Sequence, residues 1–310
     1  MDALPIPDRL EKGYVSHTDG LGHKCGHDGH MAILCGVAAG LSASPPLRGE
    51  VVLLFQPAEE TGEGAALILA DQEFQRLRPD VAYALHNLPG FRAGSVVIRD
   101  GCFASASRGM VIHLAGESAH AAEPHKARSP GLAVAGLIEG ISALPQTCCP
   151  LDEACKATVI HARLGERAFG TTPGEAVVMA TLRTHSEETM GSLAAAAEKL
   201  AASAAEPLGL DVRVSWTEEF PATINTPESA GLVREVAREA GFEIVERSVP
   251  FPWSEDFGHF TREFGGALFG LGAGENHAPL HNSGYDFPDS LLQPGRDLLE
   301  RLVRRYLKRD

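Results

Sequence analysis

Two continuous apolar runs lie in the first third of the chain, at residues 51–55 and 81–85. Runs of this length predict strands that are buried on both faces of a sheet. Residues 31–42, which are rich in Ala, Leu and Gly, predict a buried helix before them. Polar residues follow each run directly, at 56–60 and at His86-Asn87. Because ligands of α/β sheets collect beyond the carboxyl ends of strands, these polar residues fall where a site is expected.

The pattern changes at about residue 105. The predicted elements that follow are a strand at 109–115, a helix from Ser129-Pro130 to about Pro145, strands near 157–164 and 175–184, a helix at about 186–206 and a strand at 212–216. Their order, β-α-β-β-α-β, is that of the split βαβ arrangement, a small two-layer domain.

The α/β pattern resumes after residue 220. Thr226-Pro227 begins a helix that Gly241 ends. An apolar strand is predicted at 266–271, and a final amphipathic helix starts at about Pro294. The sequence therefore predicts an α/β protein whose first domain is discontinuous, with these boundaries: 1–104 and 221–310 for the first domain, and 105–220 for a domain inserted into it.

Charge and composition narrow the class of partner. The chain has 310 residues, of which 44% are hydrophobic and 22% charged, as in soluble globular proteins, and its formal net charge is −14. So acidic a chain is not expected to bind nucleic acid or an anionic membrane, since both attract basic patches. It has no apolar run of about 18 residues and no signal-peptide pattern at its start. Its six cysteines show no secreted spacing, which predicts reduced thiols and a cytoplasmic location.

The most informative motif is Cys25-Gly26-His27, which lies just before the first predicted helix. Thiolate and imidazole hold divalent transition metals, and a loop at a helix start can aim both at one ion. Taken alone, the motif fits a buried Cys beside a structural His equally well. Glu59-Glu60 closes the first predicted strand, where adjacent carboxylates point in different directions. One of them can bind metal while the other reaches the water on the metal.

His86 and His281 each follow an apolar run. A single His in such a place is more often a hydrogen-bonded loop or core residue than a ligand. Together with Cys25, His27 and Glu60, the two make five ligands, enough for two ions that clamp a bridging water. The combination predicts metal-assisted hydrolysis.

Three further residues are candidates for contact with a substrate. His120 lies in the predicted inserted domain, and Arg183 ends one of the strands of this domain. Asn225 lies just beyond the C-terminal boundary of the domain. Arg183 and Asn225 have side chains that bind a carboxylate or an oxyanion, but surface roles fit the sequence equally well.

Seven motifs of the chain together resemble those of a known group. They are Met1-Asp2-Ala3-Leu4-Pro5-Ile6, His23-Lys24-Cys25-Gly26-His27-Asp28-Gly29-His30, Gln56-Pro57-Ala58-Glu59-Glu60, Ala84-Leu85-His86-Asn87, Ala119-His120-Ala121-Ala122 with Pro124-His125, Ser254-Glu255-Asp256-Phe257 and Leu280-His281-Asn282. In this order, over essentially the whole chain, they resemble the aminoacylase/carboxypeptidase-like dinuclear metallohydrolases. The likeness is to the branch with hippurate hydrolase, auxin-amino acid conjugate hydrolase and N-acetyl-diaminopimelate deacetylase.

The resemblance implies a phosphorylase/hydrolase-like catalytic domain with a mixed sheet and an inserted ferredoxin-like βαββαβ lid. It implies two divalent ions and makes Glu59 the general acid and base. The metal ligands that it implies are Cys25, His27, Glu60, His86 and His281. Zn²⁺ suits the Cys and His ligands, and the mixed set also accepts Mn²⁺, Ni²⁺ or Co²⁺.

The resemblance also implies hydrolysis of the amide bond of N-acyl amino acids or related conjugates, which are small molecules. Similar enzymes are homodimers built through the lid. Their lid histidine, matched here by His120, reaches the partner subunit's site and supports the oxyanion. Asn225 and Arg183 match positions on the substrate side.

One departure from the family pattern concerns the N-terminal part. In the family, a strand ending in an Arg-x-Asp-Met-like run and further elements precede the Asp-Ala-Leu-Pro motif, whereas here the chain starts at that Met. We therefore expect an incomplete sheet with an exposed edge. Two other functions stay open. One is a dipeptidase or aminopeptidase, which needs a pocket for a free α-amine; the other is a catalytically inactive, truncated metal-binding protein.

Overall fold

A computed structural model describes residues 2–308, so Met1 of the first motif lies outside the described residues. The chain forms two compact units. The first unit combines the chain up to Phe103 with Thr223–Pro250 and the chain from Asp256 onward. The second contains Ala104–Ala222 and also Phe251–Glu255, a segment that the sequence analysis assigned to the first domain.

The first unit is built on a mixed four-stranded sheet, which agrees with the predicted fold class. Its strands, in spatial order, are β1 (Ala82–Pro89), β12 (Gly266–Gly274), β2 (Val96–Ile98) and β11 (Ile244–Glu246). β1 runs parallel to β12 and β11 parallel to β2, whereas β12 and β2 are antiparallel. The predicted strands at 81–85 and 266–271 are thus confirmed, and the structure pairs them as neighbours.

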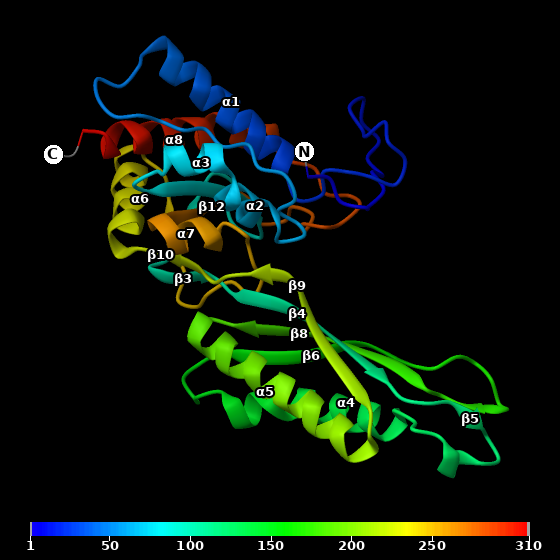
Figure 1. The fold of residues 1–310 in the computed structure, drawn as a ribbon. Helices are drawn as coiled ribbons and strands as arrows, with labels where there is room; N and C mark the ends of the chain where they lie inside the picture. Colours follow the sequence, from blue (N-terminus) through cyan, green and yellow to red (C-terminus); the bar gives the residue numbers. More distant parts are fainter. Residues whose placement is uncertain (1, 309–310) are drawn as a thin grey trace. The chain divides into compact units, whose positions relative to one another are not determined.

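Three amphipathic helices bury their apolar faces against this sheet. They are α1 (His27–Ala43), α6 (Pro227–Glu239) and α8 (Leu292–Tyr306), all three predicted from the sequence. The Thr226 side chain caps α6 and Pro227 opens it, as expected. α1 and α8 pack side by side, blue and red in Figure 1. Their shared core contains Ile33, Val37, Leu298 and Leu302 together with Phe269 of β12.

Shorter elements complete the first unit. They are α2 (Gly64–Ala70), α3 (Gln72–Leu77) and α7 (Gly258–Phe264), the single turn Asp289–Leu291, and the two-stranded pair of β3 (Gly101–Ala104) and β10 (Thr223–Asn225). A small satellite core of Ala65, Phe74 and Phe260 joins α2, α3 and α7. This cluster fixes the start of α2, which follows directly on the segment that contains Glu59 and Glu60.

The predicted strand at 51–55 is not a strand in the structure, so this prediction was wrong. Val51 and Leu53 pack against the hydrophobic core, but Val52 and Phe55 remain 38% and 46% exposed. A strand needs a hydrogen-bonded neighbour as well as apolar side chains. In the described part of the chain β1 is an edge strand, paired with β12 alone. Apolar burial therefore holds this segment without a sheet ladder.

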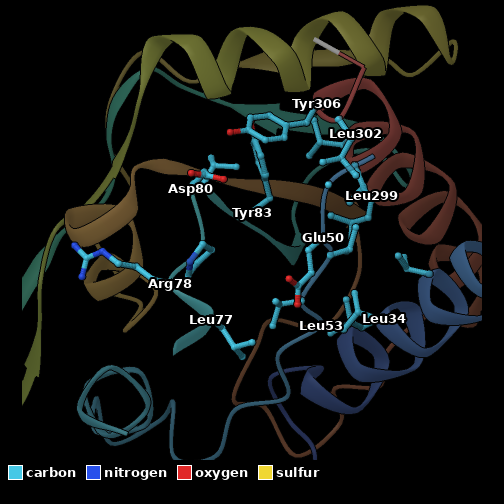
Figure 2. A pocket seen from close by; sticks show the side chains of 18 residues that line it. Leu34, Glu50, Leu53, Leu77, Arg78, Asp80, Tyr83, Leu299, Leu302 and Tyr306 are labelled. Atoms are coloured by element: carbon cyan, nitrogen blue, oxygen red, sulfur yellow. The ribbon is translucent and has the colours of Figure 1, made fainter. Parts of the chain in front are cut away.

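A groove of about 320 Å³ borders both β1 and the 51–53 segment. Tyr83 of β1 and Leu302 and Tyr306 of α8 are among the side chains that line it (Figure 2). The rings of Tyr83 and Tyr306 meet edge to face, with centroids 6.2 Å apart. The groove accounts for the partial exposure of Tyr83 in a run that was expected to be buried on both faces.

The second unit has the predicted β-α-β-β-α-β order. Its elements are β4 (Ala106–Ala115), α4 (Gly131–Cys148), β6 (Cys155–Leu164), β8 (Glu175–Thr184), α5 (Glu187–Ala205) and β9 (Asp211–Phe220). The antiparallel sheet order β6-β8-β4-β9 is the ferredoxin-like order. A smaller pair, β5 (Ala119–His120) with β7 (Thr171–Thr172), and the single turns Pro124–Lys126 and Glu206–Leu208 complete the unit.

Two details of the second unit differ from expectation. α4 continues through Pro145 to Cys148, because a proline within the last turn removes one hydrogen bond without ending the helix. Cys149 and Cys155 form a disulfide, so the prediction of reduced thiols was wrong for this pair. The end of α4 and the start of β6 bring the two cysteine Cα atoms to 6.2 Å, within the usual range for such a bond.

Among the described residues, none of the helices combines the length and apolarity that crossing a bilayer requires.

Candidate metal centre

Cys25 and His27 flank Gly26, the residue just before α1. Gly26 takes a left-handed conformation with φ 94°, which glycine adopts without strain. A Cβ at Gly26 would lie 2.5 Å from the amide oxygen of Asn87 and 2.8 Å from the hydroxyl of Tyr285. Glycine is therefore required both by the turn and by the close packing. Because the backbone turns at Gly26, the Cys25 thiol and the His27 imidazole lie at the same end of the sheet.

Glu59 and Glu60 lie in a tightly closed turn that precedes α2. Ala58 has φ 54°, and a Cβ at Gly64 would lie 1.8 Å from the carbonyl oxygen of Pro57. The backbone N–H groups of Glu63 and Gly64 donate to the Ala58 carbonyl and close the turn. The turn thus presents two adjacent carboxylates from a backbone that has little freedom to move.

The buried carboxylate of Asp256 ties both ends of this turn together. It accepts hydrogen bonds from the side-chain amide of Gln56, at 2.6 and 2.7 Å, and from the Ala65 N–H at 2.9 Å. The backbone N–H of Asp256 lies 3.4 Å from the Glu59 carboxylate. In the sequence Asp256 is recognisable only as part of a motif, and its supporting role becomes visible in the fold.

His86 lies on β1 with its ring orientation fixed. Its Nδ1–H donates to the Asn87 carbonyl oxygen at 2.8 Å, so the lone pair that can bind a metal is on Nε2. That Nε2 lies 3.4 Å from the Sγ of Cys25. Neighbouring His30 contacts Asn87, and its ring meets that of His86 edge to face, with ring centroids 4.6 Å apart. His30 was expected from the sequence only as a possible support for the ligands, and the structure places it against His86 and Asn87.

His281 reaches the centre from a loop after β12. Its φ is 62°, a strained value for a residue other than glycine, and its backbone N–H donates to the Lys24 carbonyl at 2.7 Å. Its Nε2 lies 3.5 Å from Glu60 Oε2. The side chain is 52% exposed, so His281 forms the solvent side of the centre.

The five predicted ligands therefore converge in two overlapping groups. Cys25, His27 and His86 form one, and Cys25, Glu60 and His281 form the other; within each, the donor atoms lie within 4.8 Å of one another. Cys25 belongs to both groups. Glu60 Oε1 is buried, and the described part of the chain offers it no hydrogen-bond partner. A metal ion would satisfy that oxygen, so thiolate, imidazole and carboxylate here fit a pair of divalent ions.

A third group brings in a residue that sequence reasoning missed. Asp2, His27 and Glu59 also have donor atoms within 4.8 Å of one another. Asp2 accepts a hydrogen bond from the Glu60 N–H at 2.9 Å and lies 3.7 Å from His27 Nδ1. Carboxylates in this place orient a metal-binding imidazole. Its presence in the Asp-Ala-Leu-Pro motif was the signal that could have identified it.

Burial of this acidic centre shifts its pKa values strongly. It raises the pKa of Glu59 to about 8, with the negative charges of Asp256 and Glu60 adding to the effect. Burial also lowers the pKa of His86 to about 4 and that of His27 below its ordinary value. Both imidazoles are therefore neutral at pH 7, the form that binds metal, and Glu59 is poised to exchange a proton.

The raised pKa of Glu59 predicts that stability falls with pH when metal is withheld. Between its ordinary pKa of 4.5 and about 8, the folded chain holds a proton that the unfolded chain has lost. Folding is therefore disfavoured progressively as pH rises through this window, by up to a few kcal/mol. We expect Glu59→Gln to gain stability over the unsubstituted protein from pH 6.5 to 8, measured by urea unfolding in a chelator. If the free energies of unfolding of the two proteins changed in parallel over this pH range, the prediction would be contradicted.

The other predicted site residues do not join this cluster within the first unit. The Asn225 amide is fully buried and bonded to the backbone of Arg99 and Leu268, so it holds β10 beside β12. Arg183, in the second unit, donates to the Pro252 carbonyl and, at 2.9 Å, to the Ser254 hydroxyl. His120, also in the second unit, is exposed, and its Nδ1 accepts the Ala122 N–H. Their roles toward substrate stay predictions.

Comparison with known proteins identifies the family. The model of peptidase family M20/M25/M40 matches residues 1–305. The chain belongs to this family. As a member of this peptidase family it is a hydrolase, and the prediction of an enzyme is confirmed.

Individual relatives of this family member cover nearly all of the chain. Hippurate hydrolase of Campylobacter jejuni is 30% identical over 99% of this chain and 80% of its own length. N-acetyl-L-cysteine deacetylase of Bacillus subtilis is 29% identical over 99% of this chain and 73% of its own. A solved structure of a Bacillus subtilis peptidase of the family, described as binding a dinuclear metal, matches with a TM-score of 0.82. It is 23% identical and covers 100% of this chain and 80% of that one, which shows the shared fold.

Proposed function

We propose that the protein is a metal-dependent amidohydrolase that cleaves the amide bond of N-acyl amino acids or related conjugates. The observation that carries this proposal is the convergence of Cys25, His27, Glu60, His86 and His281, with Glu59 beside them. These five donors are of mixed type, and one of them, Glu60 Oε1, is buried without a hydrogen-bond partner among the described residues, which suits two divalent ions. The family relatives that cleave acyl groups from amino acids support the substrate class.

Glu59 is the proton carrier of the proposed reaction. Two divalent ions bound by these residues would acidify a water and polarise the amide carbonyl. The Glu59 carboxylate, 3.7 Å from His27 Nε2, then takes the water proton as the oxygen attacks the carbonyl carbon. It later gives this proton to the departing amine, which leaves as the free amino acid. A raised pKa suits a group that must both accept and donate a proton near neutral pH.

Residues of the second unit complete the proposal. His120, on the exposed pair β5 and β7, is proposed to act on the oxyanion in the site of a second copy of the chain, as the family resemblance implies. Arg183 and Asn225 are proposed on the substrate side for the same reason. The proposed assembly is therefore a homodimer. The proposed location is the cytoplasm, because the four cysteines other than Cys149 and Cys155 form no disulfide.

A pair of matched substrates tests the reaction class. We expect release of the amino acid from N-acetyl or N-benzoyl amino acids, with dipeptides that carry a free α-amine turned over far more slowly. The assay uses purified protein reloaded with Mn²⁺ or Zn²⁺ and detects the liberated amine. Preferential cleavage of the free dipeptide would favour the peptidase alternative. Bound metal without turnover of either substrate would favour the non-catalytic alternative.

A further inference from the structure

Lys24 is one of the most deeply buried side chains of the protein, although lysine is rarely enclosed. Only 1% of it is exposed, and it directly precedes the candidate ligand Cys25. Its ammonium group pairs with the Asp8 carboxylate at 2.7 Å and donates to the Tyr285 carbonyl at 2.9 Å. A buried ion pair adds little net stability, since desolvation offsets most of the attraction. The position of Lys24 therefore points to a role other than general stabilisation.

Lys24 holds both ends of the turn that contains His281. Its backbone carbonyl accepts the His281 N–H at 2.7 Å, and its side chain holds the Tyr285 carbonyl four residues later. Between these contacts, the Tyr285 N–H donates to the Asn282 carbonyl at 2.8 Å. His281 itself sits at φ 62°, which costs free energy and persists only where neighbours enforce it. Lys24 supplies two of the contacts that enforce it.

The two donor groups of the centre depend on this turn unequally. The group of Cys25, His27 and His86 comes from the start of α1 and from β1, and none of its ligands lies in the turn. The group of Cys25, Glu60 and His281 depends on the turn for its exposed imidazole. Loosening the turn therefore displaces a ligand of the second group, whereas the three ligands of the first group keep their own backbone supports.

We propose that Lys24 is a positioning residue for one ion of the pair, through the turn that presents His281 to Cys25 and Glu60. This inference rests on the proposed dinuclear centre. Asp8 takes part because it neutralises the ammonium group inside the protein. It also accepts the N–H groups of Leu10 and Ser16, which ties the N-terminal loop to the same place.

Metal stoichiometry in Lys24→Met tests the proposal without any assay of activity. The substitution keeps the apolar stem and removes both ammonium contacts. In titrations of chelator-stripped protein with Mn²⁺ or Zn²⁺, we expect the unsubstituted protein to bind two ions. Lys24→Met should bind one ion with unchanged affinity and the second at least about tenfold more weakly, a loss of the size known for residues that support metal ligands. His281→Ala should give the same selective pattern.

Lys12→Met is the matched control. Lys12 pairs with Asp286 next to the same turn, but it is 42% exposed and makes no contact with Tyr285 or His281 among the described residues. This variant should bind both ions normally. The double variant Lys24→Met/Asp8→Asn leaves no buried charge uncompensated and serves if the single variant does not fold. Circular dichroism and thermal unfolding check that each protein is folded.

The outcomes separate this inference from the proposed function. Fewer than two ions in the unsubstituted protein would refute the dinuclear centre itself. Two normal ions in folded Lys24→Met, or an equal loss of both ions, would overturn the positioning role and leave the centre intact. Failure of both the single and the double variant to fold would also overturn it, since Lys24 would then be a determinant of folding.

Discussion

Cys25→Ala should weaken binding of both metal ions and abolish hydrolysis. Cys25 is the one donor shared by the two ligand groups, and its side chain is 7% exposed at the centre of the cluster. The negative charge of a thiolate there would also offset the repulsion between two neighbouring cations. We expect each dissociation constant to rise by more than about 100-fold, beyond the effect of losing a group that only supports a ligand. Titration of the stripped protein with Zn²⁺ or Mn²⁺ measures this directly.

The neighbouring ligands provide the contrast. His86→Ala should weaken the ion held with Cys25 and His27, and His281→Ala the ion held with Cys25 and Glu60, each with the other ion largely retained. Cys25→Ala is therefore distinguished by losing both. If it bound two ions as tightly as the unsubstituted protein, the donor assignment would be refuted. Loss of a single ion would show that Cys25 does not bridge.

Most of the secondary structure could be predicted from local patterns. Ser186 and Thr226 cap the helices that they were expected to begin, because a side-chain oxygen before an apolar run satisfies the first N–H groups. The prediction of a strand at 51–55 was wrong for a reason that the local sequence pattern does not reveal. Whether an apolar run becomes a strand depends on a partner at the sheet edge, and β1 pairs with β12 alone in residues 2–308.

The ligand set was predictable because its residues belong to chemically distinctive motifs, whereas their supports are not distinctive in sequence. Nothing local marks Asp256 as the residue that closes the Glu59 turn, since its partners Gln56 and Ala65 lie about two hundred positions away. Likewise, nothing in the local sequence indicates that Lys24 is buried. Asn225 is a case in which the sequence does not show the local contacts: its amide is bonded to the backbone of Arg99 and Leu268, while its role toward substrate stays a prediction.

Glu59→Gln should reduce kcat by about 10³-fold, within the range known for general acid–base groups, while both metal ions stay bound. Glutamine keeps the size and the hydrogen-bonding oxygen of Glu59, so the contact with the Asp256 N–H survives. It can neither accept the water proton nor deliver one to the departing amine. KM should change little, because neither donor group that defines the two ion positions requires Glu59.

Glu60→Gln is the matched comparison, since the two residues share one turn but have different proposed roles. Burial and the negative charges of Asp256 and Glu60 raise the pKa of Glu59. In contrast, although burial itself acts in the other direction, hydrogen bonding to His281 and the nearby His27 keep the pKa of Glu60 low, as a permanently ionised ligand requires. Glu60→Gln should therefore lose an ion, whereas Glu59→Gln should lose turnover with its metal content unchanged. The reverse pattern would exchange the two assignments, and full activity in Glu59→Gln would refute the proposed proton transfer.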